Sequence, residues 1–204
     1  MSSGTVFVVD DDESVRDSIS IMLDSVGVEN RAYESALDFL EHYDADEHCC
    51  LVLDIRMPGI SGLELQDTLN GRGLEVPIVF ITGHGDIPMA VEAMRKGAVH
   101  FIRKPFREQE LLDAINEALQ LDSASRSADE ERAAVRELVS ELTPREHEVF
   151  ELVCDGKANK VIAIDLGISE RTVEIHRSQV MHKTESRSLA DLVRLKIRLE
   201  NEGV

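Results

Sequence analysis

The stretch "TVFVVDDDES", residues 5–14, joins a short apolar run directly to three carboxylates. The run is rich in β-branched residues and has the length of a buried strand. Asp10, Asp11 and Asp12 follow it without a break. These acids either start an exposed helix or belong to a site that needs negative charge. The rest of the sequence decides between the two interpretations.

Three further apolar runs resemble the first, and a marginal one lies between the first two. The clear runs are "CLVLDI" (50–55), "VPIVFIT" (76–82) and the weaker "VHFIRK" (99–104), and the marginal one is "VENRAY" (28–33). Apolar residues at three- and four-residue spacing separate them, which is typical of amphipathic helices. Five alternating strand–helix pairs predict an α/β fold, a doubly wound, five-stranded parallel sheet of the flavodoxin-like kind.

The 204 residues suffice for one large domain or two small ones. No apolar run approaches the roughly 20 residues that cross a bilayer, and the N-terminal pattern is not that of a signal peptide. Adjacent Cys49 and Cys50 would point to opposite sides of a strand, and Cys154 lies far from both. This pattern favours reduced thiols. We therefore expect a cytoplasmic protein with no membrane association.

The net charge of −18 is distributed unevenly along the chain. Residues 1–122 hold 24 acidic and 9 basic residues, whereas residues 140–204 hold 12 acidic and 10 basic ones. The acidity thus belongs to the first part, and the last part is nearly neutral. A high overall negative charge does not exclude a local DNA-binding face there.

The composition changes after residue 121. Residues 122–140 are rich in Ser, Ala and charge, and they predict either a continuation of the preceding helix or a linker that is helical in part. The alanines and Glu/Arg pairs favour a helix, whereas "DSASRS" (122–127) favours a break. The preceding residues 1–121 form the first predicted domain. Residues 141–204 contain no strand-like run of useful length, so we expect an all-α second domain.

Capping signals divide this second domain into helices. Thr143, Pro144 and Glu146 form the N-cap, first-turn proline and capping-box acid of one helix. A short helix then ends at Gly167, and Ser169 caps the next. A helix, a glycine-containing turn and a second helix form the helix-turn-helix pattern.

The polar residues of the first domain follow its predicted strands. Asp10 and Asp11 follow the first, Asp54 the third, Thr82 the fourth and Lys104 the fifth. In parallel sheets ligands bind at these carboxyl ends. Because carboxylates repel one another, their convergence predicts a divalent cation, Mg²⁺ or Mn²⁺. A carboxylate beside a metal, a lysine and a hydroxyl can accept a phosphoryl group.

The motifs "VVDDD", "LVLDIRMPG", "FITGHG" and "FIRKPF" closely resemble, in order and spacing, the receiver domain of bacterial two-component response regulators. The resemblance implies that Asp54 is the phosphoacceptor. It implies a metal site made by Asp10, Asp11, Asp54 and the backbone carbonyl of Arg56.

The same resemblance assigns the residues that sense the phosphoryl group. Thr82 and Lys104 would contact it, and Phe101 would occupy the aromatic switch position. The Lys104–Pro105 bond is expected to be cis, and His84 is expected mainly to shape its loop. Such a receiver is not an enzyme: it assists only its own phosphoryl transfer and dephosphorylation.

The C-terminal motifs "LTPREHEV", "ANKVIAIDLGIS" and "RTVEIHR" resemble the LuxR-type helix-turn-helix, and the two domains together resemble the FixJ/NarL family. Residues 169–183 would be the recognition helix. The predicted DNA-contacting residues are Lys160, Arg171, Thr172, Glu174, Ile175, Arg177, Ser178 and Lys183. Of these, Glu174, Ile175 and Ser178 would face bases, and the basic residues would hold phosphates. Thr184 and Glu185 depart from the family pattern.

The resulting hypothesis is a transcriptional regulator controlled by phosphorylation from a sensor histidine kinase. Its partners would be double-stranded DNA, RNA polymerase and, on phosphorylation, a second copy of the chain. A haloacid-dehalogenase-like phosphatase would need D-x-D at the nucleophile, but Ile55 and Arg56 follow Asp54. A pseudo-receiver regulated by partner contacts alone predicts a damaged pocket, whereas every expected pocket residue is present.

Overall fold

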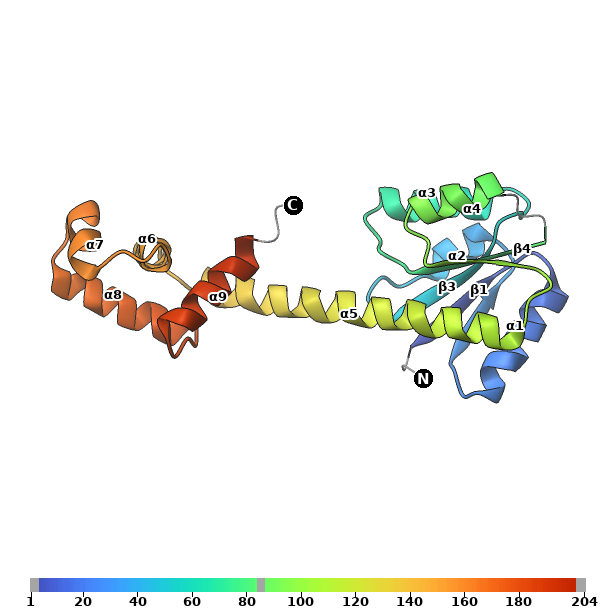
Figure 1. Ribbon diagram of the computed structural model, residues 1–204, viewed down its shortest axis with the longest axis horizontal. Coiled ribbons are helices and arrows are strands. Elements are labelled where there is room, and N and C mark those ends of the chain that lie inside the picture. The colour runs from blue at the N-terminus through green and yellow to red at the C-terminus, as the bar shows by residue number, and fades with distance from the viewer. Residues whose placement is uncertain (1–3, 84–86, 201–204) are drawn as a thin grey trace. The chain divides into compact units, whose positions relative to one another are not determined.

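The computed structural model describes residues 4–83 and 87–200. The chain divides into two compact units, Met1–Arg126 and Ser127–Val204. Figure 1 shows a sheet with helices on both faces in the first unit and helices alone in the second. Among the described residues, no helix is long and apolar enough to span a membrane.

The first unit is the predicted five-stranded parallel sheet, with strand order β2-β1-β3-β4-β5. The strand β2 lies on one side of β1, and β3, β4 and β5 lie on the other, which is the topology of a doubly wound sheet. The strands are β1 Thr5–Val9, β2 Asn30–Tyr33, β3 Cys49–Asp54, β4 Ile78–Thr82 and β5 His100–Arg103. The helices that accompany them are α1 Glu13–Ser25, α2 Ala36–His42, α3 Gly62–Gly71, α4 Ile87–Arg95 and α5 Glu108–Ser140.

Alternate strand residues fill two apolar layers, one on each face of the sheet. On β1, Val6 and Val8 belong to one layer, while Phe7 and Val9 belong to the other. Cys50 and Cys49 are buried in opposite layers in the same way, as their adjacency predicted. Burial on both faces explains why the strands are continuous apolar runs rather than alternating ones.

The strand register brings the predicted polar residues to one edge. Val9 lies opposite Leu53 in the β1–β3 pair, so Asp10 follows at the level of Asp54. Asp54 in turn lies opposite Ile81, the residue before Thr82. The carboxyl ends of β1, β3 and β4 therefore present their side chains to the same region.

Capping explains one of the three consecutive acids. Asp12 is the N-cap of α1, and its carboxylate accepts a hydrogen bond from the Ser14 N–H. Free N–H groups at a helix start favour such an acceptor. Asp12 therefore serves the helix, which leaves Asp10 and Asp11 for the strand end.

The helix α5 runs unbroken through the predicted linker, including the "DSASRS" segment (Figure 1). Of the two predicted alternatives, the continuation of the preceding helix is therefore confirmed. The first compact unit also extends to Arg126 rather than to residue 121. The physical reason is a set of contacts made by Asp122 and Arg126, described below.

The second unit is all-helical, as predicted. Its core includes Val149, Phe150 and Val173, and Gly167 ends the second helix with a left-handed φ of 66°. Leu192 is buried in this core, so the last helix packs on its own unit. The helices that follow α5 are α6 Pro144–Cys154, α7 Asn159–Leu166, α8 Glu170–Lys183 and α9 Leu189–Glu200.

Candidate functional site

Lys104 joins two buried carboxylates at the carboxyl edge of the sheet. Its Nζ lies 2.5 Å from Asp10 Oδ2 and 2.7 Å from Asp54 Oδ1. Asp10 is 1% exposed and Asp54 5%. Buried carboxylates require paired charge or hydrogen bonds, and one ammonium serves both here. Residues from three strand ends, predicted separately from the sequence, thus meet in one site.

Backbone contacts orient these carboxylates. The second oxygen of Asp54 accepts a hydrogen bond from the Arg56 N–H at 2.6 Å, and Asp10 Oδ1 accepts one from the Asp12 N–H at 3.0 Å. Arg16, on α1, donates to the Asp10 carbonyl at 2.7 Å. Arg16 was not among the predicted site residues, because its role depends on the helix reaching back over the loop.

Gly62 is a second residue that sequence reasoning missed. A Cβ on Gly62 would lie 2.3 Å from the Asp54 carbonyl oxygen, a distance that real Cβ atoms do not adopt. Its N–H also donates to the Ile55 carbonyl at 2.9 Å. Glycine at this position therefore lets α3 begin against the backbone of the predicted phosphoacceptor.

The pocket holds one ammonium group, that of Lys104, between the carboxylates of Asp10 and Asp54. Burial raises the pKa of Asp10, and repulsion from Asp54 adds to this, although Lys104 opposes it. Burial disfavours the ammonium of Lys104, but hydrogen bonds to Asp10 and Asp54 outweigh burial and raise the pKa of Lys104. One cation between two carboxylates gains from both, whereas each carboxylate has only a share of the cation. Lys104 therefore stays charged.

The same pocket has the oxygen donors that a hard divalent cation prefers. Asp10, Asp11, Asp54 and Arg56 all line a hollow of about 270 Å³. Asp11 is exposed, and among the described residues no three His, Cys, Asp or Glu side chains are already grouped as metal ligands. The donor chemistry fits Mg²⁺ or Mn²⁺, and binding would require Asp11 to turn toward the other two carboxylates.

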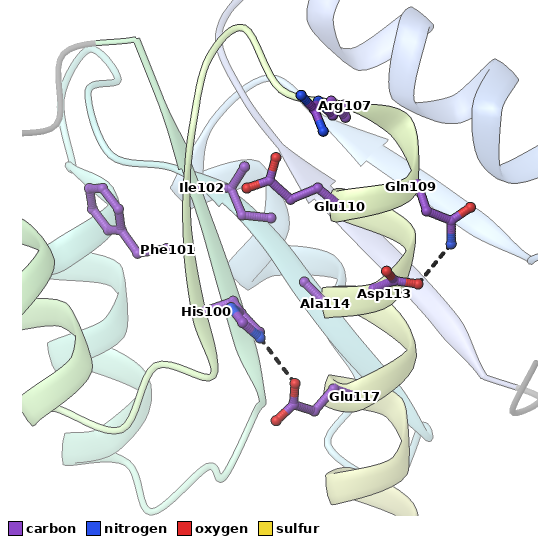
Figure 2. Close-up of a pocket in the computed structure, with 9 residues that line it drawn as sticks. All are labelled: His100, Phe101, Ile102, Arg107, Gln109, Glu110, Asp113, Ala114 and Glu117. Carbon is purple, nitrogen blue, oxygen red and sulfur yellow. Dashed lines mark hydrogen bonds and ion pairs between the residues drawn. The ribbon is translucent and has the colours of Figure 1, made fainter.

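The predicted sensing residues lie on the two strands beyond β3. Thr82 ends β4, is 1% exposed and lines the pocket. Phe101 is half-buried in β5 opposite Phe80, and Figure 2 shows its ring pointing away from α5. The Lys104–Pro105 bond is cis, as expected. His84 lies outside the described residues.

A groove of about 590 Å³ lies between β5 and α5 (Figure 2). His100 Nε2 lies 3.0 Å from Glu117 Oε2 across it, and Gln109 donates to Asp113 at 2.7 Å. These two contacts pair neighbouring side chains. The residues that line the groove do not include carboxylates that converge on one lysine, as they do in the Asp54 pocket.

In the second unit, α8 presents a polar face opposite its core residues Val173 and Val180. The predicted base-facing residues Glu174, Ile175 and Ser178 are all exposed, and Ile175 is 55% exposed. Two of the predicted phosphate contacts, Lys160 and Arg171, are exposed as well.

The other predicted DNA contacts are already engaged within the unit. Lys183 Nζ lies 2.7 Å from Glu146 Oε2 and 3.1 Å from the Glu141 carbonyl. Arg177 donates to Asn159 Oδ1 at 2.6 Å. Lys183 thus ties the end of α8 to the start of α6, and it could bind phosphate only by weakening this tie.

Three residues at the ends of α8 have local structural roles. The Thr172 hydroxyl is 2.7 Å from the hydroxyl of Ser169, the N-cap of α8. Thr184 is buried and donates to the Val180 carbonyl at 2.7 Å. Glu185 adopts a positive φ of 53°. The family departures at Thr184 and Glu185 thus form the turn that ends α8.

Comparison with known families agrees with this architecture. Residues 6–116 match the family described as "Response regulator receiver domain", and residues 140–196 match "Bacterial regulatory proteins, luxR family". The chain belongs to the response regulators: it is a two-component response regulator with a receiver domain and a LuxR-type DNA-binding domain.

Relatives resemble the chain over nearly its whole length. Nodulation protein W of Bradyrhizobium diazoefficiens is 50% identical over 190 residues, 93% of this chain and 84% of that protein. Transcriptional regulatory protein FixJ of Azorhizobium caulinodans is 43% identical over 190 residues, 93% and 90% of the two chains.

Two solved structures also resemble the chain over nearly its whole length. Response regulator StyR is 52% identical with a TM-score of 0.89, covering 95% of this chain and 98% of its own. Full-length FixJ from B. japonicum is 37% identical with a TM-score of 0.58, covering 98% and 99%.

Proposed function

We propose that the chain is a transcriptional regulator whose DNA binding is controlled by phosphorylation of Asp54. The observation that carries this proposal is the convergence of Asp10 and Asp54 on Lys104, where both carboxylates are buried and line a hollow. The phosphoryl donor would be a sensor histidine kinase. Beyond assisting its own phosphoryl transfer and dephosphorylation, the chain would not act as an enzyme.

In the transfer, a carboxylate oxygen of Asp54 forms a bond to phosphorus as the P–N bond of the donor phosphohistidine breaks. No general base is needed, since the carboxylate is already ionised at neutral pH. Lys104 would move its hydrogen bond from Asp54 to a phosphoryl oxygen and neutralise part of its charge. Mg²⁺ or Mn²⁺, held by Asp10, Asp11, Asp54 and the Arg56 carbonyl, would supply the remaining positive charge.

The response would then pass through Thr82 and Phe101 to α4. Within α4, all of whose residues are described, Ala93 alone is buried. Ile87, Val91 and Met94 are exposed at helical spacing, and Ile87 is 80% exposed. A loosely packed helix with an exposed apolar stripe suits a surface that rearranges and pairs with a second copy of the chain. We place phosphorylation-dependent homodimerisation there.

The output would be double-stranded DNA bound by α8 in the major groove. Ile175 suits contact with a thymine methyl group, and Glu174 can accept a hydrogen bond from the cytosine amino group. Arg171 and Lys160 would contact phosphates and set orientation rather than sequence. RNA polymerase would be the partner at the promoter, and the cytoplasm would be the compartment, because DNA is there.

Labelling with acetyl phosphate tests the phosphoryl acceptor. Intact mass spectrometry should show one added phosphoryl group in the presence of Mg²⁺ and none in the Asp54→Asn variant. Asp17→Asn removes an exposed acid of α1 and is the matched control, expected to be labelled like the wild type. Equal labelling of Asp54→Asn and the wild type would disprove the assignment.

A further inference from the structure

Three side chains fasten α5 to the loop between α2 and β3. They are His48, Asp122 and Arg126, and together they are called the α5 anchor below. Asp122 and Arg126 lie beyond residue 116, where the receiver match ends, yet inside the first compact unit. The site described above does not use any of them.

Asp122 is the centre of the α5 anchor. Its side chain is buried, with the whole residue only 3% exposed. One carboxylate oxygen accepts hydrogen bonds from the Cys49 N–H at 3.1 Å and from Arg126 Nε at 2.8 Å. Cys49 is the first residue of β3, the strand that ends in Asp54. The carboxylate therefore binds α5 directly to the start of the central strand.

Arg126 completes the attachment with its remaining guanidinium nitrogens. Nη1 donates to the Asp46 carbonyl at 2.9 Å, and Nη2 donates to the carbonyls of Ala45 and Glu47 at 2.8 and 2.6 Å. His48 Nε2 lies 2.9 Å from the Leu119 carbonyl. A planar guanidinium that contacts three carbonyls and one carboxylate leaves its helix little freedom to turn or lift away.

The attachment explains why α5 continues through a segment whose residue types favour a break. Ser123, Ser125 and Asp122 are weak helix formers in a helix interior. Past Arg126, residues 127–134 are exposed except for half-buried Ala128, and the next buried residue is Val135, which belongs to the core of the second unit. The α5 anchor therefore lies at the C-terminal end of the part of α5 that belongs to the first unit.

We propose that Asp122 and Arg126 are positioning residues that transmit the state of the receiver to the DNA-binding unit. They hold the end of α5 rigidly on the receiver. A conformational change at the receiver surface would therefore move α5 and would not be lost in a flexible linker. The inference rests on the proposed function. Without the α5 anchor, residues 120–126 would lose their attachment to the receiver and become a flexible connection, which lowers the effective concentration of the second DNA-binding unit at a paired site.

The test compares two arginines of the same helix. Arg126→Ala removes the guanidinium contacts of the α5 anchor, whereas Arg132→Ala removes an exposed arginine that pairs with Asp129 on the same helix. The probe is a fluorescent duplex selected from a random pool by wild-type protein with beryllofluoride and Mg²⁺, and its isolated half-site serves as a second probe. Fluorine NMR of bound beryllofluoride reports whether the Asp54 pocket is intact.

For Arg126→Ala we expect unchanged beryllofluoride binding and half-site affinity, with beryllofluoride stimulation of paired-site binding reduced about three- to tenfold. Arg132→Ala should match the wild type. Hydrogen exchange should show faster exchange of amides 120–126 in Arg126→Ala and unchanged exchange in Arg132→Ala. Arg126→Lys, which keeps the charge but not the planar fork, should behave like Arg126→Ala.

Each other outcome overturns the inference. Stimulation equal to wild type in Arg126→Ala, with amides 120–126 loosened, would show that the α5 anchor does not transmit the signal. Loss of beryllofluoride binding or of folding in both Arg126 variants would make the α5 anchor part of the receiver's stability alone. Absence of stimulation in the wild type would instead disprove the proposed function, and the inference with it.

Discussion

The two units differ in how far their predicted functional residues are exposed. In the receiver, Asp10, Asp54 and Thr82 are buried, and Lys104 already pairs with the two carboxylates. On α8 the predicted base readers Glu174 and Ile175 are exposed. A site that performs chemistry is held in place by its own protein, since charge and orientation must be ready when the donor arrives. A DNA-binding surface, in contrast, stays exposed until DNA covers it.

Removing the charge that holds the buried pocket should have the largest effect. Lys104→Met leaves the carboxylates of Asp10 and Asp54 without their ammonium, and we expect acetyl-phosphate labelling to slow about 100-fold. Lys157→Met is the control, because Lys157 pairs with Asp165 at the surface of the second unit. Mass spectrometry over time gives both rates. Equal rates in the two variants would show that labelling does not depend on the buried charge of Lys104, and would contradict this prediction.

Steric crowding of the pocket should cost stability. Gly62→Ala places a Cβ against the Asp54 carbonyl and should lower the free energy of unfolding of the receiver by about 1–3 kcal/mol. Gly71→Ala, at the end of the same helix, meets open space and should change it by less than about 1 kcal/mol. Urea titrations measure both values. A Gly62→Ala protein as stable as Gly71→Ala would refute the close approach.

The second unit has its own buried ionic contact, which is structural. The hydrogen bond from Lys183 lowers the pKa of Glu146 from 4.5 to about 2, and the N–H of Thr143 contributes. This depressed pKa gives stability that is present above pH 4.5 and lost as the pH falls toward 2. Glu146→Gln should lower the stability of this unit at neutral pH by about 1–3 kcal/mol.

The control for this pH dependence is Glu148→Gln, since Glu148 is exposed and pairs with Arg145 on the same helix. Circular dichroism during urea unfolding between pH 2 and 7 measures the effect. A Glu146→Gln protein that loses stability on acidification as steeply as the wild type would contradict the assignment.

The smallest expected effect concerns one methyl group at the DNA surface. Replacing thymines of the selected duplex by deoxyuridine, one at a time, should weaken wild-type binding about threefold at the base pair that Ile175 contacts. Ile175→Ala should remove this sensitivity. Ile164→Ala, which alters an exposed isoleucine of α7, should keep it. Full sensitivity in Ile175→Ala would place the methyl contact elsewhere.

The sequence predicted the Asp54 pocket because the fold brings strand ends together. Apolar periodicity indicates where β1, β3, β4 and β5 end, and a parallel sheet then places Asp10, Asp54 and Lys104 at one edge. Arg16 and Gly62 were missed because their roles depend on distances between elements. The sequence left open whether α5 continues through residues 122–127 for the same reason, since Arg126 overrides a weak local preference with contacts about 80 residues away in sequence.

The DNA-binding face was predicted less completely. Residue type suggests phosphate binding for every arginine and lysine near α8, but only the structure distinguishes exposed Arg171 from Arg177 and Lys183, which have partners within the unit. The roles of these residues on DNA stay predictions.

The most direct test of the account is fluorescence anisotropy with the selected duplex, with and without beryllofluoride and Mg²⁺, for wild type and Asp54→Ala. Beryllofluoride stands for the phosphoryl group on Asp54. The account predicts tighter specific binding in the wild type with beryllofluoride and no change in Asp54→Ala. Equal affinity in all four samples would contradict it, because the receiver pocket would then not control DNA binding.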